Sequence, residues 1–429
     1  MIEFIKEAPI YSHSPGDEVR TTVSAILSAV ERDGIEGVRH FSRQLDRWDP
    51  ESFLVDAKTI SKAEEAVTPE LKEHIQLAQE QVRNFAVAQR ATLLDLEIET
   101  LPGILMGHRH IPVQGVGAYV PGGRYPMLAS SFMTIIVPKV AGVDRVIACA
   151  PPFGDKGIHP AMLYAMSTSG ADHILALGGV QAMAAMAFGI EGLEPVDIIV
   201  GAGNAYVAEA KRQLFGRVGI DLLAGPTEIA VIADANADAE LVAYDLLGQA
   251  EHGPNSSVVL ITTSRSLGEE VLSRVEALLH TWPTRDVAKI AWDQYGSIAV
   301  AQNREEAVNY SDKIAPEHLE IQVGERDLEF YVDNLRNFGS LFIGEHATVA
   351  YGDKGIGTNH VLPTMGSARF TGGLWVGKFL KTCTYQRLTE EGTVQIAPTI
   401  EAIATEEQML GHALTATIRR ERAEKNRLN

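Results

Sequence analysis

The amino-acid sequence predicts an α/β protein in which two regions form doubly wound parallel sheets, preceded and followed by helical segments. Of its 429 residues, 45% are hydrophobic, as in a globular protein long enough for roughly two or three domains. Short β-branched runs alternate with helical stretches from about residue 111 onward, and glycine-rich turns follow several of the expected strands. Such alternation is typical of parallel sheets covered by helices.

The expected elements divide the chain into four segments. Residues 17–100 show the 3.6-residue apolar spacing of helices, so residues 1–110 are expected to form a mostly helical segment that packs on the core. Runs such as GVGAYVPGG and VDIIVGAGN indicate a first α/β domain over 111–240, and SSVVLITTS and SIAVAQN indicate a second over 241–380. Residues 381–429 have a helical pattern again.

Charge and cysteine content exclude several classes of protein. The 37 Lys and Arg against 56 Asp and Glu give a net charge of −19, which argues against binding to nucleic acid or to anionic membranes. The two cysteines, Cys149 and Cys383, provide neither a disulfide framework nor a cysteine zinc site. No apolar run approaches the ~20 residues of a membrane span, and the first residues lack a signal-peptide pattern. A soluble cytoplasmic protein is therefore expected.

Three glycine-rich turns are candidates for binding a phosphate-containing ligand. They are VPGGRYP (120–126), LGGVQAM (177–183) and GAGNAYV (201–207), which contain Arg124, Gln181 and Asn204. Free N–H groups at helix N-termini suit phosphate where parallel strands end. None matches G-x-G-x-x-G, since Tyr206 stands where the third glycine would be, so ordinary strand-to-helix turns remain an alternative.

The segment LLGQAEHGPNSS suggests a metal site. It ends an amphipathic helix with Gln249, Glu251 and His252 and no Lys or Arg, although helix C-termini favour cations. Gln249 and His252 are three residues apart and therefore project from one helix face. A bound metal would supply the missing positive charge.

Other histidines also stand beside carboxylates or in glycine-rich turns. Glu317 precedes His318 in APEHLEI, Asp353 and His360 share YGDKGIGTNHVLPT, and His412 lies in QMLGHAL. Oxygen and nitrogen ligands without thiolate suit Zn²⁺ or a similar ion. Spacing alone does not show which of them are ligands, and a lone histidine is more often structural.

Five motifs together resemble the histidinol dehydrogenase family: GGVQAMAAMAFG, GPTEIAVIAD, QAEHGP, APEHLEI and GTNHVLPT. They occur in the family's order, and the resemblance covers about residues 20–415. It implies two Rossmann-like domains with an altered dinucleotide site, and a zinc- and NAD⁺-dependent four-electron oxidation of a primary alcohol through an aldehyde to a carboxylate. It also implies a homodimer in which the C-terminal segment reaches the partner subunit and the active sites are shared.

The resemblance assigns roles to individual residues. His318 is the expected general base and Glu317 the residue that activates water, and one Zn²⁺ per subunit is expected. The zinc ligands, which would also contact substrate, are Gln249, His252, Asp353 and His412. The NAD⁺ contacts are Tyr119, Gln181 and Asn204, and further substrate contacts besides His318 are Thr227, His360 and Glu407.

Some positions depart from the family's biosynthetic pattern. Arg124-Tyr125 follows the PGG turn, where small residues are usual, and Gly253 replaces an Asp. The GRY turn, GIHPAMLYA and GDK resemble a sister branch, the sulfopropanediol (2,3-dihydroxypropane-1-sulfonate) dehydrogenases, which implies a small anionic diol oxidised to sulfolactate. Arg124 is then expected to bind the anionic group, because a guanidinium suits sulfonate or carboxylate oxygens.

Alternatives remain for Arg124 and for the function. Arg124 could instead be a solvated turn residue or a contact to cofactor phosphates. Oxidation of L-histidinol to L-histidine is the alternative enzymatic function, and a catalytically inactive homologue that binds metal and nucleotide is the non-enzymatic one.

Overall fold

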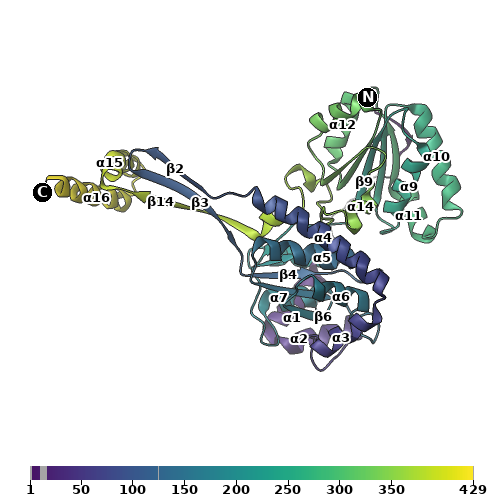
Figure 1. Ribbon diagram of the computed structural model, residues 1–429, viewed down its shortest axis with the longest axis horizontal. Helices are drawn as coiled ribbons and strands as arrows, with labels where there is room; N and C mark the ends of the chain where they lie inside the picture. Colours follow the sequence, from purple (N-terminus) through teal and green to yellow (C-terminus); the bar gives the residue numbers. More distant parts are fainter. Residues whose placement is uncertain (1, 10–16, 124, 429) are drawn as a thin grey trace. The chain divides into compact units, whose positions relative to one another are not determined.

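The computed structural model describes residues 2–9, 17–123 and 125–428 (Figure 1). The chain divides into two compact units. The first combines Met1–Ala88 with Val113–Phe379, and the second combines Gln89–Pro112 with Leu380–Asn429. Both units are therefore discontinuous in sequence.

The first sheet of the first unit has five parallel strands in the order β6-β5-β4-β7-β8. The chain begins at the central strand, moves outward on one side, then crosses to the other side, so the sheet is doubly wound and its switch point lies between β4 and β7. The strands are β4 Gly115–Tyr119, β5 Arg145–Ala150, β6 His173–Ala176, β7 Ile198–Val200 and β8 Gly219–Ile220.

Helices from two parts of the chain pack on this sheet. Helix α1 buries Val23, Ile26, Leu27 and Val30, the spacing of one helix face, in a core shared with α7 and α8. The helices are α1 Asp17–Asp33, α2 Ile35–Phe41, α3 Ala57–Ala66, α4 Pro69–Ala91, α5 Leu128–Ala141, α6 Pro160–Thr168, α7 Gly179–Phe188 and α8 Ala205–Leu214, with a π-helical turn at Ser42–Asp46.

The second sheet has the order β1-β11-β10-β9-β12-β13, with only β1 antiparallel. Alternate residues of β9 enter two different cores, because helices cover both faces of a doubly wound sheet. The strands are β1 Glu3–Lys6, β9 Glu228–Ala233, β10 Ser257–Thr262, β11 Gly296–Val300, β12 His318–Gln322 and β13 Ser340–Ile343. The helices are α9 Ala239–Ala250, α10 Arg265–Leu279, α11 Arg285–Tyr295, α12 Arg304–Ile314, α13 Glu325–Asn334 and α14 Val349–Lys354, with 3₁₀ turns at Ser367–Arg369 and Val376–Phe379.

The second unit consists of a three-stranded antiparallel sheet, ordered β14-β3-β2, and a pair of helices. Its elements are β2 Leu96–Leu101, β3 Ile104–Pro112, β14 Leu380–Leu388, α15 Glu390–Glu406 and α16 Leu410–Leu428. The helical pattern expected to reach residue 100 ends at Ala91, since LEIETL alternates with the period of a strand. The C-terminal segment is helical as expected, but only from Glu390.

The fold is thus α/β with two doubly wound sheets, as the sequence predicts. None of the described helices combines the length and the apolar character needed to cross a bilayer.

Candidate active site

The three predicted NAD⁺ contacts lie at the carboxyl edge of the first sheet. Tyr119 ends β4, Gln181 lies in the first turn of α7 after β6, and Asn204 is the N-cap of α8 after β7. The hydroxyl of Tyr119 accepts a hydrogen bond from the Gly179 N–H at 3.2 Å, which joins two of the turns. This edge is where open α/β sheets bind ligands.

Gln181 and Asn204 each retain polar groups that could meet a ligand. The buried Gln181 amide donates from Nε2 to Asp46 Oδ2 at 2.7 Å, while its Oε1 has no hydrogen-bond partner within the described part of the chain. Asn204 Oδ1 accepts from the N–H groups of Tyr206 and Val207 at 3.0 and 3.1 Å, which caps α8 and leaves the Asn204 NH₂ group to donate elsewhere.

The turn that carries Asn204 is held by a buried ion pair between Lys211 and Asp221. Lys211 Nζ donates to the Gly201 carbonyl at 2.9 Å, and Asp221 Oδ2 accepts from the Gly201 N–H at 2.7 Å. Gly201 has φ +117°, and a Cβ there would lie 2.1 Å from the Tyr119 carbonyl oxygen. Only glycine fits this close approach.

The predicted catalytic pair lies at the amino-terminal edge of the second sheet, where β12 begins beside β9. Glu317 Oε2 accepts from Thr227 Oγ1 at 2.5 Å and from the Glu228 N–H at 2.9 Å. His318 Nδ1 lies 2.9 Å from the Glu228 carbonyl oxygen, so Nδ1 carries the proton that is donated there. His318 Nε2 is buried 3.4 Å from Asp353 Oδ1 and has no hydrogen-bond partner among the described residues.

Acidic neighbours tune the charge of this pair. Burial opposes the imidazolium form of His318, but the negative charges of Glu317 and Asp353 outweigh burial and raise the pKa of His318 well above its ordinary value. Burial also raises the pKa of Glu228 to about 7. The site therefore concentrates proton-exchanging groups.

Three of the four predicted zinc ligands converge beside His318. Gln249 Nε2 donates to Thr227 Oγ1 at 2.5 Å, which leaves the Gln249 carbonyl oxygen to act as a ligand. Asp353 is buried, with Oδ2 at 3.9 Å from His252 Nε2 and Oδ1 at 3.4 Å from His318 Nε2. An amide oxygen, an imidazole nitrogen and a carboxylate oxygen fit Zn²⁺.

The fourth predicted ligand, His412, lies exposed on α16 of the second unit, as does Glu407 at the end of α15. Across the described residues, no group of three His, Cys, Asp or Glu side chains is arranged to hold a metal.

His360 bridges two elements of the site. Its Nε2 lies 2.7 Å from Ser130 Oγ on α5, and its Nδ1 lies 3.0 Å from the Asp353 carbonyl oxygen. Burial lowers the pKa of His360, so the ring is neutral. Both ring nitrogens have hydrogen-bond partners within the protein, so in this structure His360 links α5 to the segment that carries Asp353. Its predicted contact with substrate is not tested by this geometry.

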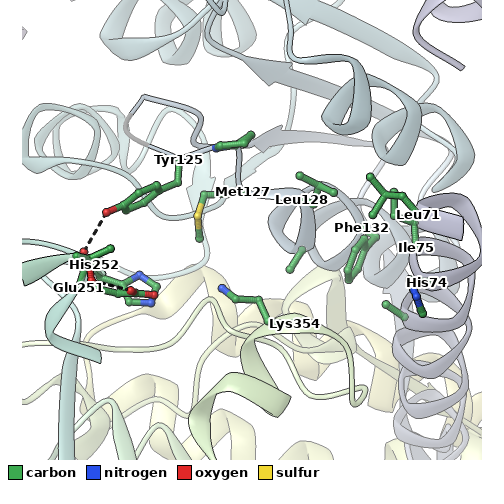
Figure 2. A pocket seen from close by; sticks show the side chains of 14 residues that line it. Leu71, His74, Ile75, Tyr125, Met127, Leu128, Phe132, Glu251, His252 and Lys354 are labelled. Atoms are coloured by element: carbon green, nitrogen blue, oxygen red, sulfur yellow. Dashed lines mark hydrogen bonds between the residues drawn. The ribbon is translucent and has the colours of Figure 1, made fainter. Parts of the chain in front are cut away.

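A cavity of about 450 Å³ adjoins His252 (Figure 2). Its walls are mainly apolar, and Tyr125 donates from its hydroxyl toward the Glu251 carbonyl oxygen at 3.5 Å. The residues that line it include Tyr125, Met127, Phe132, Glu251, His252 and Lys354. Arg124, the predicted anion contact, lies outside the described residues.

A buried acid pair connects the elements that carry the site. Gln322 Nε2 donates to Asp245 Oδ2 at 2.8 Å and to Glu320 Oε2 at 3.1 Å. Glu320 Oε1 accepts from the Val349 N–H at 3.0 Å, and Asp245 Oδ1 accepts from Thr348 Oγ1 at 2.9 Å. Burial and the adjacent carboxyl group raise the pKa of Glu320 well above its ordinary value. The pair ties together α9, β12 and α14, which carry Gln249, His318 and Asp353.

Sequence reasoning missed Lys354 and the acid pair. Lys354 directly follows a predicted ligand, Asp353, in the GDK motif, and this adjacency could have indicated it. Glu320 and Asp245 lie inside an expected strand and an expected helix, so no local signal showed that they would meet.

Comparisons with known proteins agree on one family. The family model described as histidinol dehydrogenase matches residues 12–420. A "Histidinol dehydrogenase homolog" of Shouchella clausii is 52% identical over 98% of this chain and 99% of its own length. The "Sulfopropanediol 3-dehydrogenase" of Ruegeria pomeroyi is 46% identical over 97% and 96%. The crystal structure of histidinol dehydrogenase from Elizabethkingia anophelis matches with a TM-score of 0.91 at 33% identity, covering 97% of this chain and 95% of that one.

Proposed function

The chain belongs to the histidinol dehydrogenase family, whose members are NAD-dependent dehydrogenases acting on CH–OH groups, and from this premise we propose that it oxidises a primary alcohol through an aldehyde to a carboxylate. The overall reaction consumes one water and two NAD⁺. Gln249, His252, Asp353 and His412 would hold Zn²⁺, and Tyr119, Gln181 and Asn204 would contact NAD⁺. When bound, zinc supplies a Lewis acid that orients the alcohol oxygen, and NAD⁺ supplies the hydride acceptor.

The observation that carries this proposal is the orientation of His318. Its Nδ1 is committed to the Glu228 carbonyl oxygen, which leaves Nε2, 3.4 Å from Asp353 Oδ1, as the nitrogen on the side of the candidate metal ligands. When the ring is neutral, Nε2 takes the hydroxyl proton as hydride leaves the carbon that carries the hydroxyl. His318 returns the first proton to the aldehyde oxygen as water adds, and then takes a second proton from a hydroxyl of the hydrated aldehyde as the second hydride leaves.

Glu317 serves the hydrolytic step between the two oxidations. Thr227 and Glu228 both donate to Oε2, so Oε1 remains to orient a water and accept its proton. That water attacks the aldehyde carbon and supplies the second oxygen of the carboxylate. An intact catalytic pair argues against the alternative of an inactive homologue that binds only metal and nucleotide.

The test is single-turnover NADH formation with alcohol and with supplied aldehyde. We expect His318→Ala to lower alcohol oxidation by roughly 10²–10⁴-fold, the usual effect of losing a positioned base. Glu317→Gln should impair aldehyde oxidation more than the first hydride transfer. Equal losses in both steps would contradict this division of roles.

The proposed substrate is a small anionic diol such as 2,3-dihydroxypropane-1-sulfonate, which yields sulfolactate. Two observations support it: the 46% identity to a protein named sulfopropanediol 3-dehydrogenase, and the GRY and GDK motifs. Arg124→Ala should then raise KM for the diol by roughly 10–100-fold with little change in KM for NAD⁺. Efficient oxidation of L-histidinol by the parent enzyme would instead support the biosynthetic function.

The proposed assembly is a homodimer in which Glu407 and His412 complete the partner's active site. Exposed apolar side chains on and between α15 and α16 support a contact there, because large apolar residues in one place favour association. They are Ile400, Ile403, Met409, Leu410, Leu414 and Ile418.

Mixing two inactive variants tests the shared site. His318→Ala and His412→Ala subunits, unfolded and refolded together, should regain about a quarter of parental activity, since half the dimers are mixed and each has one complete site. No recovery in mixed dimers would show that His412 serves its own subunit.

A further inference from the structure

Lys354 brings a positive charge into the cavity beside the candidate metal ligands. It is the last residue of α14 and lines the cavity with His252, and Figure 2 shows its ammonium group directed into that space. Successive residues of a helix point about 100° apart. Asp353 therefore turns toward His318 and His252, while its neighbour Lys354 turns into the cavity.

Lys354 is an exposed residue whose charge acts on the adjacent Asp353, where it helps to lower the pKa of that carboxyl group. Its charge also contributes to lowering the pKa values of His252 and His360. An ammonium group on a cavity wall is suited to a ligand that carries the opposite charge.

The remaining lining residues sharpen this conclusion. Lys354 is the one Lys or Arg among the described residues of the cavity wall. The one carboxylate there, Glu251, accepts a hydrogen bond from Thr284 Oγ1 at 3.0 Å. Met127 and Phe132 contribute apolar surface. These two side chains offer no hydrogen-bond donor to an anionic group, so Lys354 is the charged partner available to it on this wall.

We propose that Lys354 binds the anionic group of the substrate and so determines specificity for short-chain alcohols that carry a sulfonate or carboxylate. The inference rests on the proposed function, because it requires the hydroxyl end of the substrate to lie at His318 and the metal ligands. The adjacency of Asp353 and Lys354 then allows one small molecule to meet both residues at its two ends. An ammonium is a point charge with rotatable hydrogen-bond donors, so it can bind a sulfonate or a carboxylate.

The test compares Lys354→Met with Lys354→Arg, which keeps the charge, and with Lys313→Met, a matched substitution of an exposed lysine on α12. Initial rates are measured with 2,3-dihydroxypropane-1-sulfonate and with neutral glycerol. We expect Lys354→Met to lower the ratio of kcat/KM for the anionic over the neutral alcohol by roughly 10–100-fold. Lys354→Arg should retain most of that ratio, and Lys313→Met all of it.

A binding measurement separates this inference from the proposed function. Calorimetric titration with propane-1-sulfonate needs no turnover, so it reports on Lys354 even if the parent enzyme oxidises neither alcohol. Failure to oxidise either alcohol would overturn the proposed substrate and leave the binding test of Lys354 intact. Binding by the parent protein that weakens by a similar factor in Lys354→Met supports the inference. Equal binding by both proteins, no binding by either, or equal rate losses on both alcohols would overturn it.

Discussion

Replacing Lys211 by Met should both destabilise the protein and weaken its binding of NAD⁺. The side chains of Lys211 and Asp221 are only 2% and 0% exposed, so the substitution leaves a buried carboxylate without its cation. Breaking a buried ion pair in this way costs about 3–5 kcal/mol. Folded proteins are stable by about 5–15 kcal/mol in total, so the loss is a large fraction.

The assay is urea unfolding followed by circular dichroism. With a slope of about 2–3 kcal/mol per molar urea, the midpoint should fall by roughly 1–2.5 M. The Gly201 carbonyl also loses its donor, and this turn leads to Asn204, so KM for NAD⁺ should rise. In the double variant Lys211→Met/Asp221→Leu, most of the stability should return, because the unpaired charge is removed.

Lys289→Met is the matched control, since its partner Asp293 lies one helical turn away and the two side chains are 47% and 51% exposed. Such exposed pairs contribute only about 0.2–1 kcal/mol. If Lys211→Met shifts the midpoint no more than Lys289→Met, or if the double variant is less stable than Lys211→Met, the burial argument is refuted.

Two further predictions concern the metal set and the acid pair. Chelation should abolish activity while the circular dichroism spectrum stays unchanged, because large α/β domains do not depend on one ion for their core. His252→Ala should lower the bound zinc measured by mass spectrometry, and full zinc content in that variant would contradict the assignment of His252 as a ligand. The folded protein keeps a proton on Glu320 that the unfolded chain loses above its ordinary pKa of 4.5, so this group makes stability decline as pH rises from there to its raised pKa. Glu320→Gln is neutral at every pH and should flatten that decline in urea midpoints measured at about pH 5–8, whereas an unchanged slope would show that Glu320 is ionised in the folded protein.

Much of the fold could be predicted because the spacing of apolar residues along the chain matches the buried face of each helix or strand. Val23, Ile26 and Val30 recur with the period of a buried helix face, and α1 forms there. The turns after β4, β6 and β7 were visible as glycines, and the parallel sheet brings Tyr119, Gln181 and Asn204 to one edge. Those assignments to NAD⁺ remain predictions.

Other features depend on contacts between distant residues, which local patterns do not encode. Strand β3 pairs with β14 through partners such as Gly107 and Tyr385, which are far apart in the chain. Residues 96–112 were therefore expected to belong to the helical N-terminal segment, because the strand that pairs with them lies near the C-terminus. The catalytic pair was predicted by motif, but its place at the amino-terminal edge of the second sheet was not. That placement follows from the register of His318 with Ile229, a property of the assembled sheet.

The acid pair has a consequence for how loss-of-function mutations should be distributed. Helix α14 is only six residues long, and its first N–H is held by Glu320 while Asp353 lies near its other end. A small rotation at the held end therefore displaces the Asp353 carboxylate, although the core strand that carries Glu320 stays in place. A genetic selection for inactive but well-expressed variants should accordingly return substitutions at Glu320 and Asp245, in the interior of the domain, alongside those in the pocket.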